Sequence, residues 1–99
     1  MAGPIFKVWL AKGRDAFYRL SPEEREELFK KGQEALKSAG GERVISCDST
    51  WCSENWNGFG VEKFPDLESV QKYTNLLTEL DWFGYLDANT YLGTEVPEE

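Results

Sequence analysis

Apolar and polar positions along this 99-residue chain follow two periods, which divide it into six segments. Four segments alternate with the period of two and the β-branched and aromatic content typical of strands. Two segments have apolar residues at helical spacing, one after the first strand and one after the third. The pattern predicts the order strand, helix, strand, strand, helix, strand, with the strands at residues 5–12, 42–51, 56–64 and 86–95.

The first helix is predicted to begin after Ser21. Ser21 is followed by Pro22 and, three positions later, by Glu24, which matches a capping box. In this motif the side chain of each end residue of the first turn accepts a hydrogen bond from the backbone amide of the other. Gly40 and Gly41 are expected to end the helix, because glycine accepts the positive φ of a helix C-terminus. Its apolar stripe consists of Leu28, Phe29, Ala35, Leu36 and Ala39.

The remaining connections are assigned from turn and breaker residues. Pro65 stops the third strand, Asp66 caps the second helix, and that helix is expected to end near Asp81 with Gly84 breaking the chain. Residues 13–20 are expected to form a loop. Residues 52–55 are expected to form the tight turn of a hairpin between the second and third strands.

This order of elements is that of the ferredoxin-like βαββαβ fold, of class α+β. Right-handed crossovers give a four-stranded antiparallel sheet of strand order 4-1-3-2, with two helices on one face. The other face is left open, and its set of tryptophan, tyrosine, asparagine and aspartate side chains is too apolar for water and too polar for a plain core. We therefore expect one domain, residues 1–99, that associates as a homodimer through this face.

The third strand carries alternate glycines, Gly58 and Gly60, on one face. Alternate glycines leave a bare groove that admits a large ring or marks a bulge. Trp9, Trp51 and a residue of a partner subunit are the candidates for that ring.

Residues 58–73, a Gly-Phe-Gly strand followed by Pro-Asp and an amphipathic helix, resemble the corresponding segment of the dimeric α+β barrel superfamily. The resemblance implies a dimeric α+β barrel. Members of that superfamily include cofactor-independent monooxygenases, haem-degrading enzymes, muconolactone isomerases and transcriptional regulator domains. Their enzymes often use a histidine, and no catalytic residue carries over by position.

The chain contains no histidine. This removes the commonest metal ligand, haem ligation by histidine, and nucleophiles activated by a histidine base. Cys47 and Cys52 are not spaced as CxxC and are expected to be free thiols. We therefore expect no metal site and no cofactor.

The formal net charge is −7 and the isoelectric point is near 4.6. Such a surface repels polyanions, so nucleic acid and anionic membranes are not expected as partners. No segment approaches the roughly 20 apolar residues of a membrane span. The amino-terminal residues lack the pattern of a signal peptide, which predicts a cytoplasmic protein.

Three functional hypotheses remain open. The first is that a small apolar or aromatic molecule binds in a cavity formed by the open sheet face of a homodimer. The second is a cofactor-independent monooxygenase or an isomerase whose base is a buried carboxylate, Asp48 or Glu62. The third is a structural or interaction module. The candidate ligand-binding residues are Trp9, Asp48, Trp51, Asn57, Glu62 and Tyr91, with Asn89 as a further polar anchor.

Overall fold

A computed structural model of the chain describes residues 3–97. Its elements follow the predicted order, with two additional single-turn helices that the apolar pattern did not reveal, α1 and α4. In chain order they are β1 (Ile5–Gly13), α1 (Asp15–Tyr18), α2 (Pro22–Ser38), β2 (Glu42–Asp48), β3 (Gly58–Phe64), α3 (Leu67–Glu79), α4 (Trp82–Tyr85) and β4 (Leu86–Thr94).

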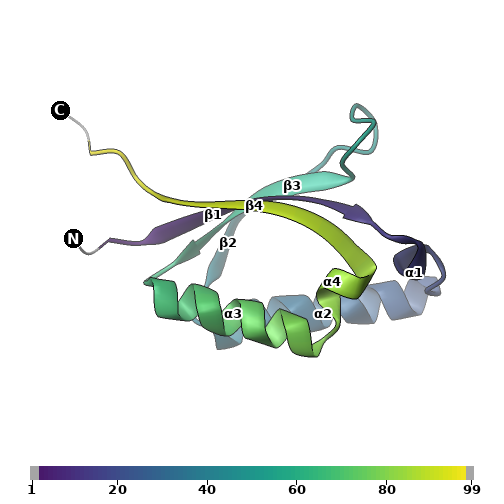
Figure 1. Cartoon of the computed structure of the whole chain (residues 1–99), viewed down its shortest axis with the longest axis horizontal. Helices are drawn as coiled ribbons and strands as arrows, with labels where there is room; N and C mark the ends of the chain where they lie inside the picture. Colours follow the sequence, from purple (N-terminus) through teal and green to yellow (C-terminus); the bar gives the residue numbers. More distant parts are fainter. Residues whose placement is uncertain (1–2, 98–99) are drawn as a thin grey trace.

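The four strands form one antiparallel sheet in the order β2-β3-β1-β4, which confirms the predicted strand order. Both long helices, α2 and α3, lie on one side of this sheet, and the other side is open (Figure 1). The apolar strand β1 occupies a central position, and the more polar β2 lies at an edge. The ferredoxin-like α+β fold is therefore confirmed.

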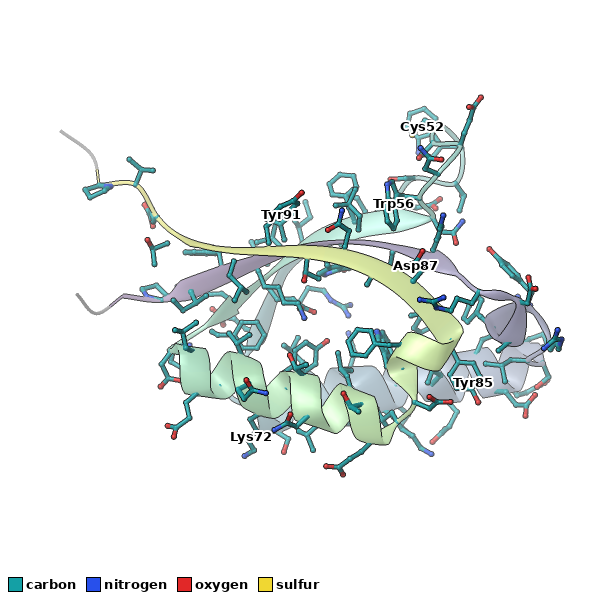
Figure 2. The ribbon with its side chains drawn as sticks, viewed as in Figure 1. Cys52, Trp56, Lys72, Tyr85, Asp87 and Tyr91 are labelled. Atoms are coloured by element: carbon teal, nitrogen blue, oxygen red, sulfur yellow. The ribbon has the colours of Figure 1, made fainter. Side chains whose placement is uncertain are left out.

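The strand register decides which side chains face the helices. Trp9 is opposite Gly60, and Lys7 is opposite Glu62, so all four belong to the helix-facing side. The intervening residue Val8 is paired with Tyr91 on the open side. Figure 2 shows the Tyr91 side chain pointing away from the helices.

The hydrophobic core lies between the sheet and the two long helices. Phe64, at the end of β3, is fully buried, and its ring centroid lies 5.6 Å from that of Tyr73 on α3. The core cluster contains most of the predicted stripe of the first helix; its members are Ala35, Leu36, Ala39, Phe64, Val70, Tyr73 and Leu77.

The predicted helix ends are confirmed at three places. Ser21 Oγ accepts a hydrogen bond from the Glu24 amide at 3.1 Å, and Glu24 Oε1 accepts one from the Ser21 amide at 2.8 Å, which completes the capping box. Gly40 has a φ of 85° after α2. Asp66 Oδ1 accepts from the Ser69 amide at 2.8 Å and caps α3.

The connection between β2 and β3 differs from the predicted tight turn. It covers residues 49–57 and rises from the sheet on the side away from the helices (Figure 1). Local bonds take this backbone out of the strand ladder: Asp48 Oδ1 accepts from the Thr50 amide, and the Ser49 carbonyl accepts from the Ser53 amide. The strands are consequently shorter than their sequence pattern indicated.

The break after α3 is also displaced from its predicted position. The residue in the left-handed region is Asp81, with φ 56°, and Gly84 lies within α4. Aspartate is among the few residues other than glycine that adopt this conformation at modest cost.

Across the described residues, no helix has the length and hydropathy required to cross a membrane.

Candidate functional site

A cavity of about 670 Å³ lies between the helix-facing side of the sheet and the helices. It is larger than the groove of about 460 Å³ at the open side, which is lined by Phe6, Val8 and Tyr91 among others. The sequence placed the cavity on the open face between two copies of the chain. In the single chain, the larger of these two cavities is on the opposite side of the sheet, beneath the helices.

Three polar side chains form a buried cluster in the cavity wall: Lys7, Glu62 and Tyr73, whose exposed fractions are 7%, 5% and 5%. The Tyr73 hydroxyl donates a hydrogen bond to Glu62 Oε2 at 3.3 Å. Lys7 Nζ lies 4.8 Å from the centroid of the Tyr73 ring. Glu62 Oε1 is buried without a hydrogen-bond partner among the described residues.

The sheet register brings this cluster together. Lys7 on β1 and Arg43 on β2 are the two cross-strand neighbours of Glu62 on β3. Arg43 also reaches α2: in the amide orientation that satisfies both groups, Gln33 Oε1 accepts from the two Nη atoms of Arg43 at 2.7 and 3.0 Å. Arg43 therefore links the edge strand to α2 beside the buried carboxyl.

Burial controls the protonation of the cluster. It raises the pKa of Glu62, although the charge of Lys7, the Tyr73 hydrogen bond and the charge of Arg43 oppose the shift. Burial lowers the pKa of Lys7, although the attraction of Glu62 opposes this shift. Burial and the nearby Glu62 both raise the pKa of Tyr73. Each shift favours the neutral form, since a charge loses hydration when it is buried.

Aromatic side chains wall the other end of the cavity. The Phe29 ring centroid lies 5.7 Å from that of Phe17 and 5.9 Å from that of Trp82. Gly32 on α2 makes room for Trp82, because a Cβ there would lie 2.6 Å from the indole. From Lys7 to Gly13, where β1 ends, the strand extends about 20 Å at roughly 3.3 Å per residue, so the polar cluster and the aromatic wall are well separated.

Trp9 lies between the two ends and fills the groove at Gly60. A Cβ at Gly60 would approach the Trp9 ring to 2.7 Å and the Ile45 carbonyl oxygen to 2.6 Å. Trp9, rather than Trp51, is thus the ring that the alternate glycines accommodate, and it forms part of the cavity wall.

The cavity wall has a charge opposite to that of the whole chain. Its ionisable side chains include four basic and two acidic residues, whereas the chain has a net charge of −7. Such a wall attracts a ligand that carries an anionic or electron-rich oxygen. These residues are Lys7, Lys12, Lys30 and Arg43 against Glu26 and Glu62.

The six predicted ligand-binding residues occupy different parts of the molecule. Trp9, Asn57 and Glu62 line the cavity, and Asn57 Oδ1 accepts from the Gly13 amide at 2.7 Å and from the Tyr18 hydroxyl at 3.2 Å. The other three are exposed, and a ligand role for any of the six stays a prediction. They are Asp48, Trp51, which is 81% exposed in the 49–57 connection, and Tyr91 on the open face.

Asp48 does not meet the condition set for a buried base. Its carboxylate is solvent-exposed and accepts hydrogen bonds from the Thr50 hydroxyl and amide at 2.7 and 3.1 Å, which hold its pKa below the usual value. Sequence reasoning missed Lys7 and Tyr73. A lone lysine within an apolar central strand was the available signal for Lys7, whereas Tyr73 was indistinguishable from a core position of the helix.

The raised pKa of Glu62 predicts a pH-dependent stability. The unfolded carboxyl titrates near about pH 4.3, so its contribution to stability is fully present below that pH and is lost as the pH rises through the higher native value. Glu62→Gln cannot titrate. Relative to this variant, the unfolding free energy of the wild type is expected to fall as the pH rises above about 4.3, measured by urea denaturation.

Glu42→Gln, at an exposed position of β2, is the matched control and should leave the pH profile of the wild type unchanged. Parallel profiles for the wild type and Glu62→Gln would show that Glu62 titrates alike in both states, contrary to this prediction.

No protein-family model matches the chain, and no curated protein matches its sequence. Among solved structures, it superposes on a chlorite dismutase from Candidatus Nitrospira defluvii with TM-score 0.75 and 19% identity, over 95% of this chain and 41% of that one. The chain thus spans less than half the length of that protein. A hypothetical protein of Arabidopsis thaliana gives TM-score 0.68 and 20% identity, over 98% of this chain and 92% of that one.

A protein from Mesorhizobium loti, described as a dabb family protein with a ferredoxin-like fold, gives TM-score 0.67 and 12% identity, with 96% of this chain and 99% of that one covered. At these identities the likeness concerns the fold. The chain therefore has the ferredoxin-like fold found in dimeric α+β barrel proteins.

Proposed function

We propose that the chain binds a small aromatic molecule bearing an oxygen substituent in the cavity between the sheet and the helices. The observation that carries this proposal is Glu62 Oε1, which is buried without a hydrogen-bond partner among residues 3–97, in the wall of a cavity that aromatic side chains line in part. A buried polar atom left without a hydrogen bond costs about 1–3 kcal/mol. A ligand oxygen placed beside it removes that cost.

Trp9 lies two positions along β1 from Lys7, on the same face of the sheet, and offers its ring to an aromatic ligand beside the polar cluster. Protonated Glu62 donates to an oxygen on that ligand and ionised Glu62 accepts from a hydroxyl, so either a carbonyl or a phenol is accommodated. The basic side chains in the wall favour the same oxygen-rich end of the ligand.

The two other functional hypotheses from the sequence fit this site to different degrees. An isomerase or cofactor-independent monooxygenase needs a buried base, and Glu62 meets that requirement where Asp48 does not. A structural or interaction module needs neither a cavity of this size nor a buried carboxyl beside a buried lysine. The cavity therefore favours a ligand-binding protein, with an enzymatic role as the second candidate.

We also propose that the open face packs against a second copy of the chain. Val8, Phe59 and Tyr91 leave large apolar surfaces exposed there, 38%, 42% and 65% of each residue. A continuous apolar face of this kind is typical of an interface. In such a homodimer, the ligand cavities lie on the outer, helix-covered sides of the two sheets.

The test compares phenol with toluene, which has a similar ring and no oxygen. Phenol is expected to quench tryptophan fluorescence with saturation and to bind up to about tenfold more tightly than toluene, the preference that one net hydrogen bond of about 1 kcal/mol provides. Glu62→Leu is expected to lose this preference while still binding the ring.

Glu42→Leu, an exposed position on the neighbouring strand, serves as the matched control and should keep the preference for phenol. Equal affinities for phenol and toluene in the wild type, or no saturable binding of either compound, would overturn the proposed function.

A further inference from the structure

Lys7 is a buried amine beside Glu62 in the cavity wall. It is 7% exposed, lies at the centre of the sheet and lines the cavity. Within the described part of the chain, the ion pairs join Lys12 and Arg14 to Asp87, so no carboxylate lies within 4.0 Å of Lys7 Nζ. The amine is therefore held in the cavity without the ion pair that normally accompanies a buried lysine.

We infer that Lys7 is a nucleophile that condenses with an aldehyde or ketone group of the bound molecule, with Glu62 as the proton donor and acceptor of the step. This inference rests on the proposed function, since it uses the same cavity. It specifies the oxygen substituent of the ligand as a carbonyl.

The geometry supplies each component of the reaction. Lys7 and Glu62 are directly opposite on adjacent strands, at the Cα separation of about 4.5–5.5 Å that such pairs have. The Tyr73 ring lies under Lys7 Nζ, and the Tyr73 hydroxyl occupies Glu62 Oε2. This arrangement leaves Glu62 Oε1 free to exchange a proton with a group beside the amine.

The step balances without an oxidant or a cofactor. The lone pair of the neutral amine forms the C–N bond, and the carbonyl electron pair moves to oxygen, which takes a proton from the Glu62 carboxyl. Glu62 then accepts a proton from nitrogen and returns it to the hydroxyl, which leaves as water while the C=N bond forms. The iminium nitrogen then returns its remaining proton to Glu62, so amine and carbonyl give an imine and one water molecule and the carboxyl is restored.

Charge in the cluster supports this chemistry. Burial lowers the pKa of Lys7 and raises that of Glu62, with the attraction between the two opposing both shifts. The net directions favour a neutral amine, which is nucleophilic, beside a neutral acid, which donates the proton. The Tyr73 face attracts the protonated amine and opposes its loss of the proton, and Arg43 lowers the pKa of Glu62.

The experiment is reductive trapping with benzaldehyde and sodium cyanoborohydride at neutral pH, followed by peptide mapping. Lys7 is expected to acquire the benzyl group at least about tenfold faster than Lys72, because its lowered pKa leaves more of the amine neutral and Glu62 lies beside it as a general acid. Lys72 is exposed on the outer side of α3 (Figure 2). Because the comparison is made within the wild-type protein, it does not depend on a variant that folds.

Two variants, with one control, separate the roles of Lys7 and Glu62. Lys7→Met should lose the fast labelling, while the control Lys72→Met keeps it. Glu62→Gln should slow the labelling of Lys7 while the circular dichroism spectrum is unchanged. Labelling of Lys7 no faster than that of Lys72 overturns the inference. If benzyl alcohol still binds with saturation in that case, the proposed function survives; if it does not, both fail.

Discussion

Phe64→Ala is expected to lower the unfolding free energy by about 3–5 kcal/mol, the usual cost of removing a fully buried phenylalanine. Phe64 has no exposed surface and ends β3 against α3, where its ring contacts Tyr73 and the core cluster. Phe64 and Leu36 of α2 both lie against Gly41, where a Cβ would approach their side chains to 2.7 and 2.6 Å. Urea denaturation at one fixed protein concentration measures the change.

The control for this variant is Leu67→Ala, which truncates an exposed residue in the first turn of α3. Its effect should stay within about 0.5 kcal/mol, as for most surface substitutions. A loss below about 1 kcal/mol for Phe64→Ala would mean that the core between sheet and helices is not packed as described.

Val8→Glu is expected to convert the proposed homodimer into a monomer. Val8 lies near the middle of the central strand β1 on the open face and is partly exposed in the single chain, so a carboxylate there is hydrated in the monomer. In a symmetric dimer, the same substitution buries two like charges without partners, at several kcal/mol each. Size-exclusion chromatography with light scattering measures the mass relative to the 11.3 kDa chain.

Gln71→Glu adds the same charge at an exposed position of α3 and should leave the dimer intact. A wild-type protein that is monomeric at micromolar concentration, or a Val8→Glu protein that stays dimeric, would contradict the role given to the open face.

The fold was predictable because its signals are local. The Ser21 capping box, the glycines after α2 and the alternation of β1 each act within a few residues, and together they determine the element order. The hairpin and the break at Asp81 were less predictable. The hairpin depends on side-chain bonds to nearby backbone, which compete with regular structure, and the break depends on the left-handed φ of one aspartate; neither leaves a periodic pattern.

The site was predictable in part. Glu62 and Trp9 were identified from strand alternation and from the glycine groove. The side of the sheet that holds the cavity was not predictable, because both faces of β1 are apolar and only the packing of the helices on one face distinguishes them. Lys7 and Tyr73 matter because the pairing of β1 with β3 and the packing of α3 on the sheet bring them together around one carboxyl, that of Glu62.

The central claim is that a ligand binds on the helix-covered side of the sheet. Nuclear Overhauser effects between bound phenol and isotopically labelled methyl groups test it most directly. Contacts to the methyls of Leu36 and Leu77, which line the cavity, are the predicted result. Contacts to the methyls of Val8 and Ile45 on the open face, with none to the two leucines, would contradict the account.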